Sequence, residues 1–264
     1  MSPPCVATII VNFRTPELTL DAVRSVLGEP ETAEVIVVEN ASGDDSERLL
    51  REGIGGDSRV ELIVAESNRG FGAGNNLGAH AATAPILFLL NSDAILHRGC
   101  LRLLVKALEE HPEVGVVAPR LLLGDGTEQQ DAFGAFPTVG SILRNRLPDV
   151  QDPLHPDWVT GAAMAMRREE FLRLGGFDER IFMYGEDSKL CSDYARKGLG
   201  TLRVPEAVVT HLVGQSRTSS EAQRSQHLAG RDMLMRSRGT PQWVLNLIAL
   251  GRRMNDRFGR RFRR

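Results

Sequence analysis

Residues 86–96 read ILFLLNSDAIL, an apolar run that stops at three small polar residues, Asn91, Ser92 and Asp93, before the chain turns apolar again. The run at 86–90 has the length and composition of a buried strand. Ser and Asp are common turn or capping residues after a strand. Asp93 therefore has two interpretations, a turn residue or a carboxylate that binds a metal ion at the end of a strand.

The surrounding sequence alternates apolar runs with helical patterns over its first 120 residues. Because these runs are almost continuously apolar, they predict a mostly parallel sheet covered by helices on both faces. Strands are predicted at 6–11, 35–38, 60–64, 86–90 and 114–118, and helices at 16–27, 46–51, 75–82 and 101–110. Beyond a loop-rich stretch at 121–149, strands are predicted at 158–166 and 208–212 and helices at 168–174 and 188–197.

Polar clusters follow three of the predicted strands. They are Asn12-Phe13-Arg14, Glu39-Asn40-Ala41-Ser42 and Asn91-Ser92-Asp93. Sheets of this class bind ligands in a crevice outside the carboxyl ends of their strands. The three clusters therefore predict one ligand crevice.

The glycine-rich stretch 68–78, NRGFGAGNNLG, also has two interpretations. It lacks the GxGxxG spacing of a dinucleotide-binding loop, and the chain has no GxxxxGK[ST] phosphate-binding loop. The glycines can serve a close-packed turn. Alternatively, Asn75 and Asn76 beside them can bind sugar hydroxyls or phosphates.

Two further candidates lie in the second half of the chain. Glu186-Asp187 is either a helix start, where the helix dipole favours carboxylates, or a general base within reach of a hydroxyl. A single His such as His211 is more often structural than a ligand, although imidazole is a suitable metal ligand.

Composition narrows the function classes. The formal net charge of −2 gives no field that would attract nucleic acid. Three widely spaced cysteines without a CxxC argue against a disulfide framework or structural zinc and favour a reducing cytoplasm. The N-terminus does not read as a signal peptide, and no apolar run approaches the roughly 20 residues of a membrane span.

Six motifs in order resemble glycosyltransferase family 2, most closely rhamnosyltransferase-like enzymes of bacterial surface polysaccharide assembly. The resemblance covers roughly residues 6–217 and rests on IIVNFRTPELT, VIVVENASGDDS, NRGFGAGNN, LLNSDAIL, VTGAAMAMRREEFLRLGGFDERIFMYGEDSKLC and VVTHLVGQS, supported by PRLLLGDGTEQQ. It implies a single GT-A-type nucleotide-sugar fold. It also implies inverting, metal-dependent transfer of a sugar, such as rhamnose, from a dTDP-, UDP- or GDP-sugar to a glycan or lipid-linked acceptor.

The resemblance also implies residue roles. The nucleotide-sugar site would include Asn12, Arg14, Glu39, Asn40, Gly72, Asn75, Asn76, Asn91 and Ser92, with Gly161 on the acceptor side. Asp93 and His211 would bind Mg²⁺ or Mn²⁺. Asp187, beside Glu186, would be the catalytic base.

Two departures from the family pattern stand out. Asn91 replaces the first acid of Asp-x-Asp, and Lys189 replaces the later acid of Glu-Asp-x-Asp. They motivate a rival interpretation, a nucleotide-sugar-binding protein without turnover. The other rival is a sugar-nucleotide nucleotidyltransferase, although no glycine-rich, basic signature follows the first strand.

The C-terminal 24 residues are basic and apolar. Residues 241–264 hold seven arginines, one aspartate and apolar residues including Trp243 and Leu247. Such a segment is either a solvated helix or a peripheral contact with the inner face of the cell membrane. We expect a transferase domain at 1–240 (nucleotide-sugar half 1–120, acceptor half 121–217, helix 218–240), followed by this tail.

Overall fold

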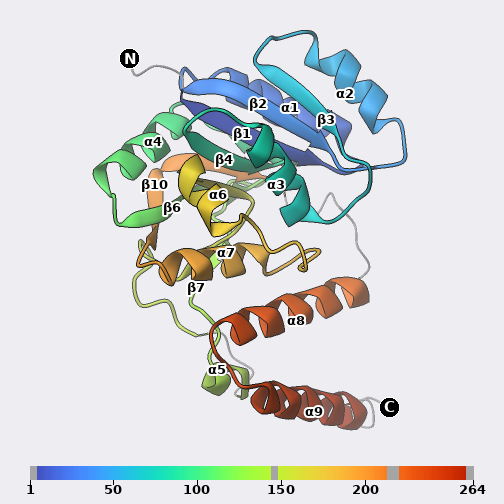
Figure 1. The fold of residues 1–264 in the computed structure, drawn as a ribbon, viewed down its shortest axis with the longest axis vertical. Coiled ribbons are helices and arrows are strands. Elements are labelled where there is room, and N and C mark those ends of the chain that lie inside the picture. The colour runs from blue at the N-terminus through green and yellow to red at the C-terminus, as the bar shows by residue number, and fades with distance from the viewer. Residues whose placement is uncertain (1–4, 144–147, 213–219, 260–264) are drawn as a thin grey trace.

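The computed structural model describes residues 5–143, 148–212 and 220–259. A curled eight-stranded sheet forms its centre, in the order β3-β2-β1-β4-β9-β6-β10-β5 (Figure 1). β1, β2, β3 and β4 pair in parallel, as do β6 and β10, whereas β9 and β5 run antiparallel to their neighbours. The bounds are β1 Val6–Asn12, β2 Thr32–Glu39, β3 Val60–Val64, β4 Ile86–Asn91, β5 Ala94–Leu96, β6 Val114–Leu123, β9 Ala163–Arg167 and β10 Gly200–His211.

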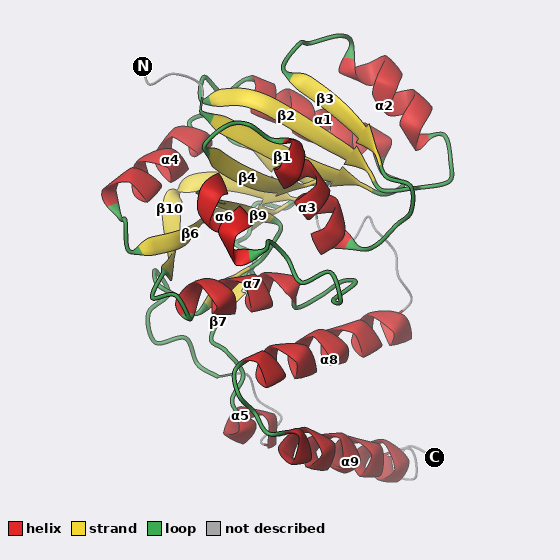
Figure 2. Cartoon of the chain, viewed as in Figure 1, coloured by secondary structure: helices red, strands yellow, loops and turns green. Residues whose placement is uncertain are grey.

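Helices cover both faces of the sheet (Figure 2). They are α1 Pro16–Leu27, α2 Ser46–Ile54, α3 Phe71–Ala81, α4 Cys100–Glu110, α5 Val139–Leu143, α6 Arg168–Leu174, α7 Glu186–Ala195, α8 Ser220–Ser237 and α9 Gln242–Gly259. β7 Phe133–Gly134 and β8 Trp158–Val159 form a separate two-stranded ribbon. Among the described residues, no helix is long and apolar enough to span a membrane.

The core has two layers because the central strands are buried on both faces. In β2, Val35 and Val37 join one apolar cluster, with residues of α1, α2 and α4, while Ile36 and Val38 join the other, with residues of α3, α6 and α7. Successive strand residues point to opposite faces. A strand between two helix layers therefore needs an unbroken apolar run, as the sequence predicted.

Several predicted elements differ from the structure, including the last strand, which begins at Gly200 and not at residue 208. The short strand β5 was not predicted. The strand expected at 158–166 is divided into β8 and β9 by a break at residues 160–162. The glycine-rich stretch is helical from Phe71 rather than from Asn75, because small residues let α3 approach β1: a Cβ on Gly74 would lie 2.9 Å from Val11 Cγ1.

The C-terminal helices extend the molecule beyond the sheet. α8 lies between α7 and α9 in Figure 1. Leu234 of α8 joins the core cluster of α7, and Met235 on the next position packs against Leu245 and Ile248 of α9. α8 therefore connects the sheet domain to the basic segment at 241–264.

Candidate functional site

The carboxyl ends of β1 and β2 are tied together by Asn12 and Ser42. The buried Asn12 amide accepts a hydrogen bond from Thr19 Oγ1 (2.9 Å) and donates to Ser42 Oγ (3.4 Å). The backbone N–H of Arg14 also donates to Ser42 Oγ, at 3.0 Å. Asn12 thus fixes the loop that carries Arg14 rather than offering its own amide to a ligand.

Arg14 is the exposed cation of this rim. Its backbone is in the left-handed region (φ 60°), and its Nε donates to Ser42 O at 3.0 Å. Left-handed backbone costs a non-glycine residue energy and is common at binding sites. The guanidinium is therefore held over the end of β2, where its outer nitrogens face solvent.

Glu39 and Asn40 are buried at the end of β2. Glu39 Oε1 accepts from the Ser42 N–H at 2.9 Å, and Asn40 Nδ2 donates to Asn68 Oδ1 at 3.1 Å. Glu39 Oε2 has no hydrogen bond in the described structure. Among the described hydrogen bonds, Asn40 Oδ1 is likewise unused, so both oxygens can accept from a ligand hydroxyl or base.

Asp93 and His211, 118 positions apart, meet at the end of the sheet. β5 pairs with β10 so that Ala94 faces His211, and Leu212 N donates to Asp93 O at 2.8 Å. Asp93 Oδ1 and His211 Nε2 are 3.2 Å apart, and both side chains are largely buried. The predicted convergence of these two residues is present in the structure.

Two amides orient the His211 ring. Gln129 Oε1 lies 2.9 Å from Nδ1, and Asn91 Nδ2 lies 3.2 Å from Nε2. Nδ1–H donating to Gln129 leaves the Nε2 lone pair directed toward Asp93 and Asn91. This tautomer, assigned from the hydrogen bonds, presents a neutral imidazole nitrogen beside a carboxylate oxygen.

This donor set suits a divalent cation. Adjacent ligands of an octahedral Mg²⁺, each about 2.1 Å from the metal, would lie about 3 Å apart, close to the observed Asp93–His211 separation. Among the described residues, no three His, Cys, Asp or Glu side chains gather as a metal site. Asp93 and His211 could hold a cation whose other ligands come from water or a bound substrate.

Asp187 lies at the start of α7, facing the break between β8 and β9. Its Oδ2 accepts from the Gly161 N–H (3.1 Å), and its Oδ1 accepts from the Ser188 N–H (2.6 Å). A Cβ on Gly161 would lie 2.9 Å from the Phe71 ring and 3.7 Å from Asp187 Cβ. Glycine is needed here because a side chain would displace Phe71.

The same break ties Asp187 to the Asp93–His211 pair. Asn91 N donates to Ala162 O at 2.9 Å, one residue after the Gly161 N–H that holds Asp187. The segment 160–162 thus contacts both the Asp187 carboxylate at the start of α7 and the polar end of β4.

Burial raises the pKa of both carboxyls in the Glu186–Asp187 pair. The pKa of Glu186 rises to about 8, chiefly through burial and further through the charge of Asp187, and its Oε2 has no hydrogen-bond partner. Burial also raises the pKa of Asp187, but hydrogen bonds from Gly161 and Ser188 oppose it. Because these donors favour the ionised form, we assign the negative charge to Asp187 and the proton to Glu186.

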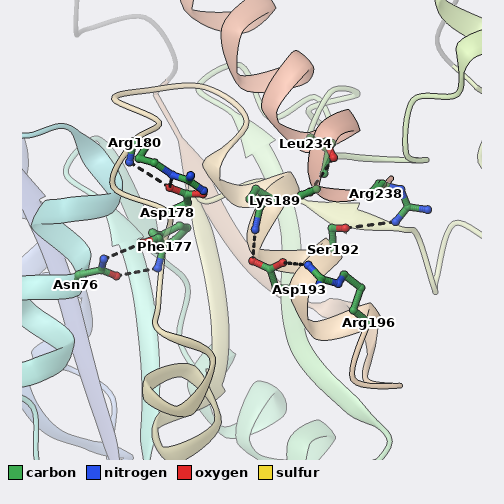
Figure 3. A network of polar contacts seen from close by, with 11 residues as sticks. Asn76, Phe177, Asp178, Arg180, Lys189, Ser192, Asp193, Arg196, Leu234 and Arg238 are labelled. Atoms are coloured by element: carbon green, nitrogen blue, oxygen red, sulfur yellow. Dashed lines mark hydrogen bonds and ion pairs between the residues drawn. The ribbon is translucent and has the colours of Figure 1, made fainter. Parts of the chain in front are cut away.

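α3 carries Gly72, Asn75 and Asn76, each of which contacts other residues of the protein. Asn76 is 6% exposed; it donates to Phe177 O and Glu179 Oε1 and accepts from Phe177 N at 2.8 Å (Figure 3). Asn75 Nδ2 donates to Phe71 O, and a Cβ on Gly72 would meet Phe177 Cβ at 2.8 Å. Their assignment to a substrate site stays a prediction, and these contacts explain them without a ligand.

Other polar residues of the site lacked a clear sequence signal. Gln129 belongs to the quoted motif PRLLLGDGTEQQ, but nothing in the motif placed it against His211. Thr15 Oγ1 lies 3.0 Å from Ser92 Oγ, which connects the ends of β1 and β4. Lys189, which replaces the later acid of the family pattern, points along α7 to Asp193 (2.5 Å) (Figure 3). Its positive charge is therefore neutralised within the helix.

An open hollow of about 590 Å³ lies beside Gln129. It is lined by Leu123, Thr127, Glu128, Gln129, Gln130 and Asp131. Because Gln129 also holds His211, this hollow adjoins the Asp93–His211 pair.

Comparison with known proteins gives concordant matches. A family model described as "Glycosyl transferase family 2" matches residues 7–174. The O-antigen biosynthesis protein RfbC of Myxococcus xanthus is 30% identical over 226 residues, which are 80% of this chain and 17% of that protein. The N-acetylglucosaminyl-diphospho-decaprenol L-rhamnosyltransferase of Mycobacterium tuberculosis is 26% identical over 206 residues, 67% of this chain and 66% of that protein.

Solved structures share the fold. The mannosyltransferase PcManGT from Pyrobaculum calidifontis, in complex with GDP-Man and Mn²⁺, superposes with a TM-score of 0.66 at 21% identity, over 94% of this chain and 68% of that chain. GalNAc-T7 with UDP, GalNAc and Mn²⁺ gives a TM-score of 0.69 at 18% identity, over 89% and 48%. The GT-A-type α/β fold predicted from the sequence is confirmed.

The raised pKa of Glu186 predicts a pH-dependent stability difference. The folded protein binds a proton more tightly than the unfolded chain, so stability falls as pH rises from about 4.5 to about 8. Glu186→Gln keeps the shape without the charge. The stability of the variant relative to wild type should therefore increase as pH rises from about 4.5 to about 8 and stay constant at higher pH.

Urea unfolding at pH 5, 6.5 and 8 measures this difference. The exposed Glu110, changed to Gln, serves as the control and should follow wild type at each pH. A Glu186→Gln difference that is the same at pH 5 and pH 8 would contradict the raised pKa.

Proposed function

The chain belongs to glycosyl transferase family 2 and is a glycosyltransferase, and from this premise we propose that it is an inverting enzyme that uses a nucleoside-diphosphate sugar. The resemblance to the family is thereby confirmed. The observation that carries the proposal is the convergence of Asp93 and His211 at the strand ends, with Asp187 held on the same segment that contacts Asn91.

The reaction we propose is a single displacement. The acceptor oxygen forms a bond to the anomeric carbon while the bond from that carbon to the diphosphate oxygen breaks, and the nucleoside diphosphate leaves. Asp187 accepts the acceptor proton, since it is the ionised member of its pair. A general base is typically worth about 10²–10⁴-fold in rate.

The strand ends supply the donor site in this proposal. Arg14 and Glu39 Oε2 would contact the nucleoside, and Asp93 with His211 would hold Mg²⁺ or Mn²⁺ beside the diphosphate. The cation, when bound, neutralises charge on the departing diphosphate. PcManGT and GalNAc-T7 share this fold and were determined with Mn²⁺, which supports divalent-metal use.

The acceptor we propose is a glycan carried on a lipid at a membrane surface. α9 exposes Trp243 (65%), Leu247 (57%) and Leu250 (54%), which lie at i, i+4 and i+7 and so form one stripe. The seven arginines of 241–264 complement anionic lipid headgroups. The relative from M. tuberculosis acts, by its name, on a diphospho-decaprenol-linked sugar, which supports this choice.

Asp187→Asn should lower turnover by about 10²–10⁴-fold, because the amide cannot accept the proton. Binding of the nucleotide sugar should not change. Transfer rate and donor binding by calorimetry are the measurements. Asp193→Asn is the matched control, since Asp193 lies on the same helix but pairs with Lys189 and Arg196; turnover close to wild type in Asp187→Asn rules out its role as base.

Asp93→Ala and His211→Ala should weaken nucleotide-sugar binding, and EDTA should abolish transfer until Mn²⁺ is added. Melting-temperature shifts with UDP-, GDP- and dTDP-sugars, in Mn²⁺ and in EDTA, measure the binding. The largest shift identifies the nucleobase of the donor. His97→Ala is the control, because His97 also joins β5 to β10, through Thr210 Oγ1, but is exposed. Equal shifts in Mn²⁺ and EDTA argue against the cation.

Flotation with liposomes tests the membrane contact. The full-length chain should float with anionic vesicles and much less with zwitterionic ones. A chain that ends at Gly239 and the double variant Leu247→Glu, Leu250→Glu should both stay behind. The contact is refuted when all three proteins float equally.

A further inference from the structure

Arg231 of α8 is a half-buried cation that the fold leaves without a hydrogen bond. Its Nε and Nη2 are inaccessible to solvent and have no hydrogen-bond partner. Arg231 forms an ion pair with Asp232, but Nη2 lies 3.8 Å from Asp232 Oδ1, too far for a hydrogen bond. Buried polar groups are nearly always paired, so an exception of this kind calls for an explanation.

Arg231 lies on the side of α8 that faces the catalytic helix. Residues 227, 231, 234 and 238 follow the i, i+4, i+7 spacing of one helical stripe. Of these, His227 stacks on Tyr184 at 4.0 Å, Leu234 is in the core, and Arg238 donates to Ser192 Oγ of α7 at 3.3 Å (Figure 3). The second member, Arg231, makes no hydrogen bond to α7 or to the segment before it.

α8 reaches the catalytic carboxylates through a glycine contact. A Cβ on Gly230 would lie 1.9 Å from Tyr184 O, in the segment directly before Glu186 and Asp187. Only glycine permits this approach. Arg231, the next residue, is therefore fixed close to the start of α7 by backbone packing.

α8 also places Arg231 between a contact near Tyr184 and a contact with the buried side of α9. His227, Arg231 and Met235 are successive i, i+4 positions, so each lies about 6 Å further along the helix. His227 stacks at the Tyr184 end, and Met235 packs against Leu245 and Ile248 of α9. A ligand that ran along α8 from Tyr184 toward α9 would pass Arg231, whose Nε and Nη2 lack hydrogen bonds.

We propose that Arg231 binds the phosphate through which a carrier lipid is attached to the acceptor sugar. This inference rests on the proposed function and names its acceptor class, a sugar joined by phosphate ester to a lipid. A phosphate oxygen supplies the missing acceptor for Nε and Nη2, and guanidinium–phosphate hydrogen bonds are strong because both partners are charged. The order sugar, phosphate, lipid matches the order Asp187, Arg231, α9.

The test compares farnesyl phosphate with farnesol as probes for the full-length protein in EDTA. By calorimetry, wild type should bind farnesyl phosphate at least about tenfold more tightly than farnesol. Arg231→Gln should lose this preference, and Arg231→Lys should keep part of it. Arg236→Gln, an exposed arginine of the same helix, is the control and should match wild type.

The proposal is overturned if wild type shows no preference for farnesyl phosphate over farnesol, or if Arg231→Gln keeps that preference unchanged. It is also overturned if UDP, GDP or dTDP with Mn²⁺ displaces farnesyl phosphate, because the phosphate would then occupy the donor site. Nucleotide-sugar binding by the same preparations is a separate measurement. If wild type does not bind nucleotide sugars, the proposed function is refuted. If Arg231→Gln still binds nucleotide sugars but loses the preference for the phosphate, both the proposed function and the role of Arg231 are supported.

A stability measurement separates this role from a structural one. Removing an unsatisfied guanidinium should not destabilise the fold, so Arg231→Met should melt at or above the wild-type temperature while losing the phosphate preference. A lower melting temperature in Arg231→Met would show that Arg231 supports the fold, and would refute the proposal.

Discussion

The antiparallel pairing of β5 with β10 is the constraint on which the site depends. It sets Ala94 opposite His211 and so brings Asp93 Oδ1 within 3.2 Å of His211 Nε2. Two electron-rich donors this close repel one another unless a proton or a cation lies between them. A pairing of only three residues thus brings together the two side chains that we propose as metal ligands.

The break between β8 and β9 links this pair to Asp187, the carboxylate that we propose as the catalytic base. Ala162 O accepts from Asn91 N on one side, and Gly161 N donates to Asp187 on the other. Ala162 O continues the pairing of β9 with β4 by accepting from Asn91 N, whereas the Gly161 N–H donates to the Asp187 side chain. The break thus frees one backbone donor for α7 while the segment stays attached to β4.

α8 adds a second layer to the catalytic helix. Gly230 packs on Tyr184, Leu234 enters the core and Arg238 reaches Ser192, so the helix is anchored at three levels. Arg231 on the same side forms a 3.8 Å ion pair with Asp232, and its Nε and Nη2 have no hydrogen bond. A guanidinium with unused donors on an anchored helix is well suited to bind an anion, since part of the cost of ordering it is already met in folding.

The sequence by itself determined the α/β class, the type and approximate place of most elements in the sheet, and the residues of the strand ends. Uninterrupted apolar runs such as 86–90 are possible only between two helix layers, and α1 and β3 occupy the predicted residues. Tertiary structure alone decided which polar residues are free. Asn76 is predicted as a ligand residue and in the structure bonds Phe177, which the sequence did not indicate, while Gln129 and Arg231 carried no clear signal. The reason is that hydrogen-bond partners come from distant elements, and local periodicity does not encode which elements meet.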